Sequence, residues 1–254
     1  MATHLPIKER NACLNHKNSE PDSKPTINEP FRSFEKACHN HFISTSLLAL
    51  KEPPLKRPID IFLSILLFVL SLPITLLVAC AIKLTDGGPI FYKQERWGKR
   101  GSKFWAFKFR TMIADSDVLY GIKQAGENDA RITRIGRVLR ATGLDELPQI
   151  FNIIKGDMSF VGPRALAVRE ILPDENGKKM NYEQIPEFWE RLLARPGLTS
   201  ISTIYRPKDI SARKKFRYDL FYIRRQSLWL DLYLIMISFW ICFRGKWETR
   251  NNKL

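Results

Sequence analysis

The sequence RATGLDELPQIFNIIKGDMSFVGPR, residues 140–164, combines more structural and chemical signals than any other part of this 254-residue chain. It places two adjacent carboxylates, Asp145 and Glu146, after a run of arginines and ahead of an apolar helical pattern. Gly143 predicts the end of one helix, and Pro148 suits the first turn of the next. The carboxylates are therefore expected at a helix N-terminus, where the dipole favours negative charge. They are either a helix cap or a reaction centre.

Arginines precede this pair at positions 131, 134, 137 and 140. A three-residue step drifts around a helix axis, so Arg137 and Arg140 are neighbours while Arg131 is expected on roughly the other side. We expect Arg131 and Arg134 on a solvated or lipid-facing surface and only Arg140 near Asp145. A carboxylate beside an arginine stays ionised at neutral pH, and an ionised carboxylate can act as a nucleophile.

The charge balance favours anionic partners. The chain has 41 lysines and arginines against 26 acidic residues, a net charge of +15. Nucleic acid, phospholipid head groups and phosphorylated substrates all fit such an excess. The four cysteines, at positions 13, 38, 80 and 242, include no pair with CxxC spacing. We therefore expect neither a zinc site nor disulfides, and free thiols in a reducing compartment.

The first 50 residues are predicted to be a partly disordered N-terminal extension. Residues 1–30 lack an apolar core of signal-peptide length. Residues 42–50 have the composition of a short helix that ends at the following prolines.

Residues 61–82 form an apolar run of 22 positions without a charge, long enough to span a bilayer. Pro73, near its middle, should kink or break the helix. Lysines and arginines flank both ends, and the positive-inside rule places both flanks in the cytoplasm. A re-entrant helix over about residues 59–83 satisfies both flanks and a single span does not, so re-entry is the favoured prediction, with a span and a buried core helix as alternatives.

Two aromatic-rich runs, residues 90–95 and 103–110, predict a β-hairpin because glycines lie between them. Strand alternation puts Trp105, Phe107 and Phe109 on one face and Ala106, Lys108 and Arg110 on the other. Two interpretations stay open for this basic hairpin. It is a solvated element beside anionic lipid, or Lys108 and Arg110 face a phosphate.

The C-terminal half continues the helical pattern. Residues 185–197 predict a helix, and the β-branched residues 198–205 predict a short strand. Residues 228–243 carry one charge, Asp231, and suit an interfacial helix, with a buried packing helix as the alternative. Residues 213–225 are basic with interleaved aromatics, but no nucleic-acid-binding module accompanies them, so nucleic acid is not an expected partner.

Residues 56–243 resemble the bacterial sugar transferases, the monotopic polyprenyl-phosphate phosphoglycosyl transferases. Each matching motif alone is a weak signal, but their order and spacing are specific. The motifs are KRPID at 56–60, GPIF at 88–91, QER at 94–96, KFRTM at 108–112, LDELPQIFNIIKGDMSFVGPR at 144–164 and RPGLT at 195–199.

This resemblance implies transfer of a phospho-sugar from a nucleotide sugar, usually a UDP-sugar, to polyprenyl (undecaprenyl) phosphate. Such a step begins the synthesis of a lipid-linked glycan for exopolysaccharide, O-antigen or glycoprotein. The family's catalytic dyad falls on Asp145 and Glu146, with Asp145 as the nucleophile that forms a phosphoaspartyl intermediate. The phosphate-binding candidates are Lys108, Arg110, Arg140 and Arg164, and Mg²⁺ is the expected cofactor, held near the acidic pair.

The resemblance also implies an architecture. The expected fold is predominantly α with a small β-hairpin: a re-entrant membrane helix, interfacial amphipathic helices and a cytoplasmic catalytic domain. Within a membrane-anchored domain over residues 51–254, the catalytic region covers 84–205 and the interfacial helices 206–247. We expect a minimal, single-domain member in the bacterial inner membrane, facing the cytoplasm and contacting membrane lipids.

Two departures from the family pattern matter. Leu72 precedes Pro73 where the family often has serine, and residues 200–219 differ from the usual continuation after RPGLT. The sugar is therefore left open, as is the oligomeric state. The alternative to an enzyme is a basic, non-catalytic lipid-binding or scaffold protein at the membrane.

Overall fold

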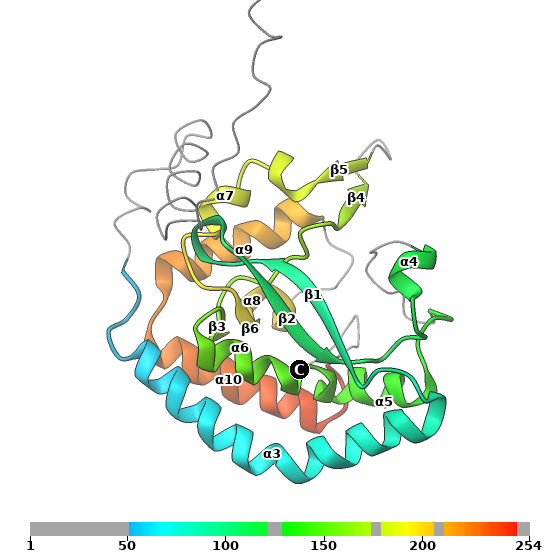
Figure 1. Cartoon of the computed structure of the whole chain (residues 1–254). Coiled ribbons are helices and arrows are strands. Elements are labelled where there is room, and N and C mark those ends of the chain that lie inside the picture. Colours follow the sequence, from blue (N-terminus) through cyan, green and yellow to red (C-terminus); the bar gives the residue numbers. More distant parts are fainter. Residues whose placement is uncertain (1–50, 121–128, 174–178, 206–210, 248–254) are drawn as a thin grey trace, which may run out of the picture.

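The structure, a computed structural model, describes residues 51–120, 129–173, 179–205 and 211–247. Within these ranges the chain is mostly helical, and its strands form three two-stranded sheets rather than the single hairpin that was predicted (Figure 1). The N-terminal extension, with its predicted short helix, lies outside the described residues.

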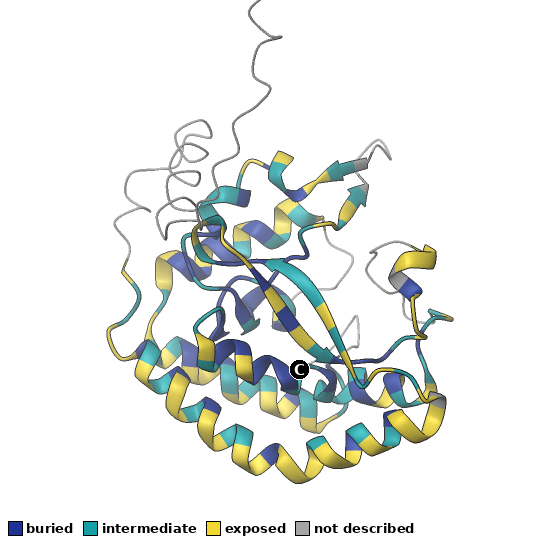
Figure 2. Ribbon diagram, in the orientation of Figure 1, coloured by how far each residue is buried: buried dark blue, intermediate teal, exposed yellow. Residues whose placement is uncertain are grey.

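Helix α3 (Lys56–Asp86) runs along the base of the molecule and bends near its middle (Figure 1). It continues through Pro73 without a break, and the Ser71 hydroxyl donates to the Phe68 carbonyl (3.1 Å) in the turn before the proline. Most of its apolar side chains are exposed (Figure 2). Of the helices in the described residues, α3 alone is long and apolar enough to cross a membrane.

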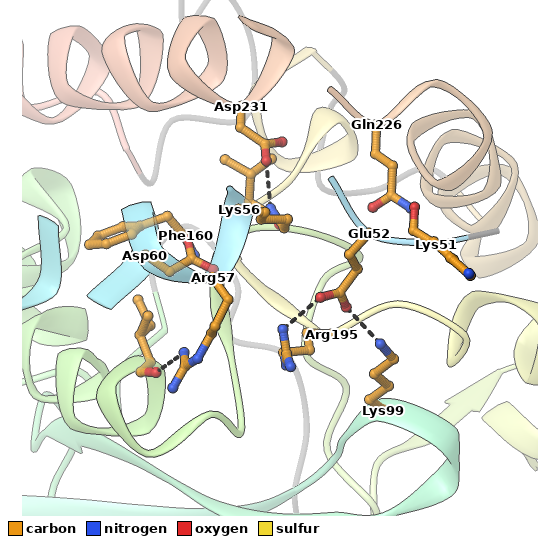
Figure 3. A network of polar contacts seen from close by, with 12 residues as sticks. Lys51, Glu52, Lys56, Arg57, Asp60, Lys99, Phe160, Arg195, Gln226 and Asp231 are labelled. Atoms are coloured by element: carbon orange, nitrogen blue, oxygen red, sulfur yellow. Dashed lines mark hydrogen bonds and ion pairs between the residues drawn. The ribbon is translucent and has the colours of Figure 1, made fainter. Parts of the chain in front are cut away.

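A buried ion pair joins the start of α3 to helix α10 (Leu228–Phe243). Lys56 Nζ lies 2.6 Å from Asp231 Oδ2, and both side chains are buried (Figure 3). Lys56 also donates to the Val161 carbonyl (3.0 Å), and the Tyr222 hydroxyl donates to Asp231 Oδ1 (2.6 Å). Asp231, the single charged residue in 228–243, is thus paired with a lysine inside the protein.

Arg57, which follows Lys56, connects α3 to residues 140–164. Arg57 donates to the carbonyls of Ile153 (2.5 Å) and Ile154 (2.8 Å) in helix α6 (Ile150–Lys155). These are carbonyls near the negative end of α6, where a cation is favoured.

Glu52, just before α3, connects two further segments (Figure 3). Its carboxylate accepts from Lys99 (2.8 Å), in the hairpin turn, and from Arg195 (2.6 Å), in the RPGLT motif. The start of α3 is therefore fixed to the hairpin, to α6 and to the RPGLT segment.

The predicted hairpin is confirmed as β1 (Phe91–Trp97) and β2 (Lys103–Phe109), which pair antiparallel around a short 3₁₀ turn, η2 (Lys99–Gly101). Ala106 is buried while Trp105 and Phe107 are exposed, as the alternation requires. Phe109 is buried as well, because α3 and α5 cover this end of the hairpin. A five-residue helix, α4 (Ser116–Tyr120), follows.

Helix α5 (Arg134–Thr142) ends at Gly143, which adopts the left-handed conformation (φ 71°) as predicted. The following element begins where expected, but its first six residues form a 3₁₀ helix, η3 (Leu144–Gln149), before α6. Arg131 precedes α5 and pairs with Asp129 (2.7 Å), so it is not on this helix. Arg134 is exposed and Arg140 is partly buried, in line with the prediction.

Two predictions after residue 185 are wrong. The helix expected over 185–197 is only α7 (Phe188–Arg191), because the chain tightens into three-residue turns through Leu193. The strand expected over 198–205 is β6 (Gly197–Thr199) followed by helix α8 (Ile201–Tyr205). The hydroxyl of Ser200 accepts the Thr203 N–H (3.1 Å), and this capping bond outweighs the β-branched composition.

The remaining elements enclose the core. Strand β3 (Ser159–Val161) pairs in parallel with β6, and β4 (Ile171–Pro173) pairs with β5 (Lys179–Asn181), which leads into η4 (Tyr182–Gln184). Helix α9 (Ala212–Arg225) and α10 pack around β3 and β6. One face of α10 is buried and the other exposes large apolar residues, as an interfacial helix requires. These exposed residues are Trp229, Leu232, Tyr233, Met236, Phe239, Trp240 and Phe243.

Candidate active site

The acidic pair lies at the first turn of η3 and faces the hairpin. The Gly143 carbonyl accepts the Glu146 N–H (3.1 Å). Lys108 Nζ, on β2, lies 2.5 Å from Glu146 Oε1 and 3.7 Å from Asp145 Oδ2. Asp145 is 6% exposed. The structure thus brings the predicted dyad and Lys108 into one cluster.

Asn152 of α6 holds η3 and α6 against β2. Its side-chain amide donates to the Trp105 carbonyl (2.8 Å) and accepts the Phe107 N–H (3.2 Å). These two bonds imitate a neighbouring strand. Because Lys108 follows Phe107 directly, the hydrogen bonds of Asn152 fix the position of Lys108 relative to the acidic pair.

Glu146 is ionised at neutral pH. Burial opposes its ionisation, but the positive charges of Lys108, Arg164 and Arg96 together hold the pKa of this carboxyl below its usual range. The cationic surroundings that the sequence suggests therefore include Arg164, which is 18 residues away along the chain, and Arg96 on the hairpin.

A close backbone contact positions Arg164. Gly162 follows β3 and Gly197 begins β6, and a Cβ at Gly162 would lie 2.3 Å from the Arg195 carbonyl oxygen. The GPR and RPGLT motifs can therefore pack together only with glycine at this contact. The Arg164 carbonyl in turn accepts Nη2 of the buried Arg191 (2.5 Å), and Arg191 is itself ion-paired with Asp219 (2.7 Å).

The other predicted residues lie at different places. Arg140 is in the last turn of α5, five residues before Asp145, and is partly buried. Arg110 is buried with its guanidinium against Gly88, where a Cβ would lie 1.8 Å from Nη1. Pro73 is an exposed residue of α3 and does not line the site.

The carboxylates of the site are the candidate ligands for Mg²⁺. Within the described ranges, no group of three or more His, Cys, Asp or Glu side chains is arranged to hold a metal ion. Mg²⁺ in phosphate chemistry is commonly held by one or two carboxylates together with substrate phosphates. Asp145 and Glu146 fit an ion shared with a bound diphosphate, and they do not form an all-protein cage.

Several residues of this region could not be assigned a role from the sequence. Asn152 lies within residues 140–164 and Arg96 within the QER motif, but the neighbouring sequence does not indicate what either residue contacts. Arg191 and Asp219 lie 28 residues apart and meet only in the folded chain. A buried charge pair of this kind leaves no pattern in the sequence.

Residues 51–245 match the family model described as bacterial sugar transferase. The chain belongs to the bacterial sugar transferase family. The resemblance predicted from the motifs is thereby confirmed, and so is the prediction of a transferase enzyme.

Over the aligned regions, three curated relatives are 35–41% identical to this family member. A UDP-glucose:undecaprenyl-phosphate glucose-1-phosphate transferase of Xanthomonas campestris pv. campestris is 41% identical over 65% of this chain. The exopolysaccharide production protein PSS of Rhizobium leguminosarum bv. phaseoli is 39% identical over 71%. A UDP-N-acetylgalactosamine-undecaprenyl-phosphate N-acetylgalactosaminephosphotransferase of Aeromonas hydrophila is 35% identical over 71%. The aligned region spans 34%, 91% and 42% of these three relatives, respectively.

Proposed function

We propose that this sugar transferase moves a sugar 1-phosphate from a UDP-sugar to undecaprenyl phosphate and releases UMP. The observation that carries the proposal is the buried Asp145, placed beside Glu146 and Lys108 at a helix start. Relatives named for this reaction with glucose and with N-acetylgalactosamine support it. A non-catalytic lipid-binding protein would not require a carboxylate and a lysine to be buried together.

The reaction has two displacements at one phosphorus atom. An Asp145 carboxylate oxygen attacks the phosphorus that carries the sugar, the bond from that phosphorus to the UMP oxygen breaks, and a phosphoaspartyl intermediate forms. An oxygen of undecaprenyl phosphate then attacks the same phosphorus and expels the Asp145 carboxylate. Because anions meet in both steps, cations must offset the repulsion, and Lys108, Arg140 and Arg164 are assigned that role, with Arg110 as a further candidate.

Mg²⁺ is proposed as the cofactor, with Asp145 and Glu146 as the protein residues that would hold it. When bound, the ion would neutralise part of the diphosphate charge. Lys108 already lies on both carboxylates, so it fixes their orientation in the protein itself.

The proposed location is the cytoplasmic face of the bacterial inner membrane, with α3 re-entrant. The undecaprenyl chain stays in lipid while the UDP-sugar stays in water, and a bent α3 would hold the site at that boundary. In a cysteine-free background, Lys51→Cys and Ser102→Cys place exposed labels before and after α3. Both should be shielded from an impermeant reagent added to the periplasm; labelling of only one would show that α3 spans the membrane.

The transfer itself is tested with purified protein, Mg²⁺, undecaprenyl phosphate and a panel of UDP-sugars, with UMP release as the readout. Asp145→Asn should abolish release, while Asp115→Asn should not. Asp115 is an exposed aspartate at positive φ (57°), a conformation that asparagine tolerates, so it is a matched control. UMP release by Asp145→Asn at the wild-type rate would exclude Asp145 as the nucleophile. The productive sugar in the panel would also decide between glucose, N-acetylgalactosamine and other donors.

A further inference from the structure

Arg96 lies on the same face of the hairpin as Lys108 but has no role in the function proposed above. In the register of β1 and β2, Tyr92 is opposite Lys108, Gln94 is opposite Ala106 and Arg96 is opposite Phe104. Residues two apart in a strand share a face. Polar side chains of β1 therefore continue the row that Lys108 begins, and Arg96 is at its far end.

The guanidinium of Arg96 is held in place by uncharged acceptors. Nη1 donates to the Ala165 carbonyl (2.7 Å) and Nη2 donates to Gln94 Oε1 (2.9 Å). Its buried Nε has no hydrogen-bond partner among the residues that the structure describes. The side chain is thus oriented by neutral groups, and part of its donor capacity is unused.

Its electrostatic surroundings are mixed. Burial lowers the pKa of the Arg96 guanidinium, and the like charge of Arg164 lowers it further, against the attraction of Glu146 and Glu170. The two hydrogen bonds described above are both to uncharged acceptors. A partly buried cation that no carboxylate neutralises by direct contact is costly to the folded protein, and a bound anion removes that cost.

We propose that Arg96, oriented by Gln94 and the Ala165 carbonyl, forms a second phosphate subsite that binds the phosphate of the departing nucleoside monophosphate. This inference rests on the proposed function. At one end of the row of polar residues, Lys108 contacts the acidic pair. At the other end, the positive charge of Arg96 attracts Glu146 electrostatically. The two phosphates of the donor thus have separate cations: Lys108 beside the attacking carboxylate and Arg96 beside the leaving group. A guanidinium with free N–H groups suits the planar, two-point recognition of a phosphate.

The test uses UMP as a product inhibitor of the purified full-length enzyme, with Arg96→Gln, Arg96→Lys and the control Arg169→Gln. Arg169 is an exposed arginine on the segment that follows Ala165. Loss of a charge-assisted hydrogen bond should weaken UMP inhibition about 10- to 100-fold in Arg96→Gln. Arg96→Lys should recover part of this loss, and Arg169→Gln should leave UMP inhibition unchanged. The KM for undecaprenyl phosphate should stay the same in every variant.

A second variant covers the case in which Arg96→Gln does not fold. Gln94→Glu keeps the hydrogen bond to Arg96 but places a carboxylate on it, so it should also weaken UMP inhibition. Unchanged UMP inhibition in Arg96→Gln or Gln94→Glu would overturn the subsite, and so would a change confined to the KM for undecaprenyl phosphate. If the wild-type protein releases no UMP with any UDP-sugar, the proposed function fails instead. The two failures are therefore distinguishable.

Discussion

Removing the charge of Lys56 tests whether the buried ion pair with Asp231 holds α3 to the rest of the protein. Lys56→Met keeps the length of the side chain and deletes its charge. Lys56 is 4% exposed, and its Nζ lies 2.6 Å from Asp231 Oδ2. In the variant Asp231 keeps the hydrogen bond from Tyr222 but loses its counter-charge.

The expected loss is large because one charge remains buried alone. Breaking a buried pair by removing one partner costs about 3–5 kcal/mol. For a chain of this size each kcal/mol shifts the melting temperature by about 2–4 °C, so Lys56→Met should lower it by about 6–20 °C. Lys56→Met combined with Asp231→Leu should be more stable than either single variant, because no lone charge remains.

The assay is thermal unfolding in detergent micelles, followed by tryptophan fluorescence, for the wild type, both single variants and the double variant. Lys155→Met is the control: Lys155 lies 3.4 Å from Asp157, but its side chain is 73% exposed. An exposed pair contributes about 0–1 kcal/mol, so the control should shift the melting temperature by less than about 4 °C. If Lys56→Met shifts it no more than Lys155→Met does, or if the double variant loses the sum of the two single losses, the ion pair is not the anchor.

Three further predictions concern the site and its supports. Gly162→Ala should greatly reduce UMP release and thermal stability, because the added Cβ would lie 2.3 Å from the Arg195 carbonyl oxygen. Asn152→Leu should cost about 1–3 kcal/mol for each hydrogen-bonding group left unpaired on β2, seen by thermal unfolding, and should lower kcat as Lys108 shifts. Burial opposes ionisation of Glu52, but Lys99 and Arg195 hold the pKa of this carboxyl below its usual value of 4.5. The ionised Glu52 therefore stabilises the fold fully above pH 4.5, and this contribution is lost as the pH falls through the lowered pKa. In Glu52→Gln, the melting temperature should therefore fall less steeply with decreasing pH below 4.5 than it does in the wild type. The same pH dependence in both proteins would contradict this prediction.

Elements with local signals could be predicted from the sequence. The uncharged run of α3, the alternation of the hairpin, and Gly143 between two helical segments each depend on a few neighbouring residues. The site candidates follow from the resemblance in motif order, which implied that Lys108 binds phosphate; in the structure Lys108 contacts the acidic pair.

Elements that depend on distant contacts could not be predicted. Strand β6 exists because it pairs with β3, from which it is separated by 35 residues, and the helix after it begins at a serine cap instead of continuing the strand. The contacts of Arg96 with Ala165 and of Arg191 with Arg164 likewise join separate parts of the chain. Composition near any one of these residues says nothing about its partner.

One distant contact did have a signal in the sequence. Asp231 is the only charge in the apolar residues 228–243, and a carboxylate in such a helix needs a partner because burial or lipid contact would otherwise be costly. The partner has no comparable signal, because Lys56 lies beside Arg57 and Asp60 at the start of α3. The sequence therefore indicates that Asp231 needs a partner, and only the structure shows that this partner is Lys56.

The contacts that support α3 and those that support the candidate active site converge on one stretch. Arg57 binds the carbonyls that end α6, whose chain begins at the acidic pair in η3. Three residues later on α3, Asp60 Oδ1 accepts the Phe160 N–H (3.3 Å) on β3, the strand that leads to Arg164. A shift at the start of α3 would therefore move both the carboxylates and the segment that carries Arg164. Because α3 is also the helix that is long and apolar enough to cross a membrane, its placement and the geometry of the proposed reacting groups depend on the same first turn.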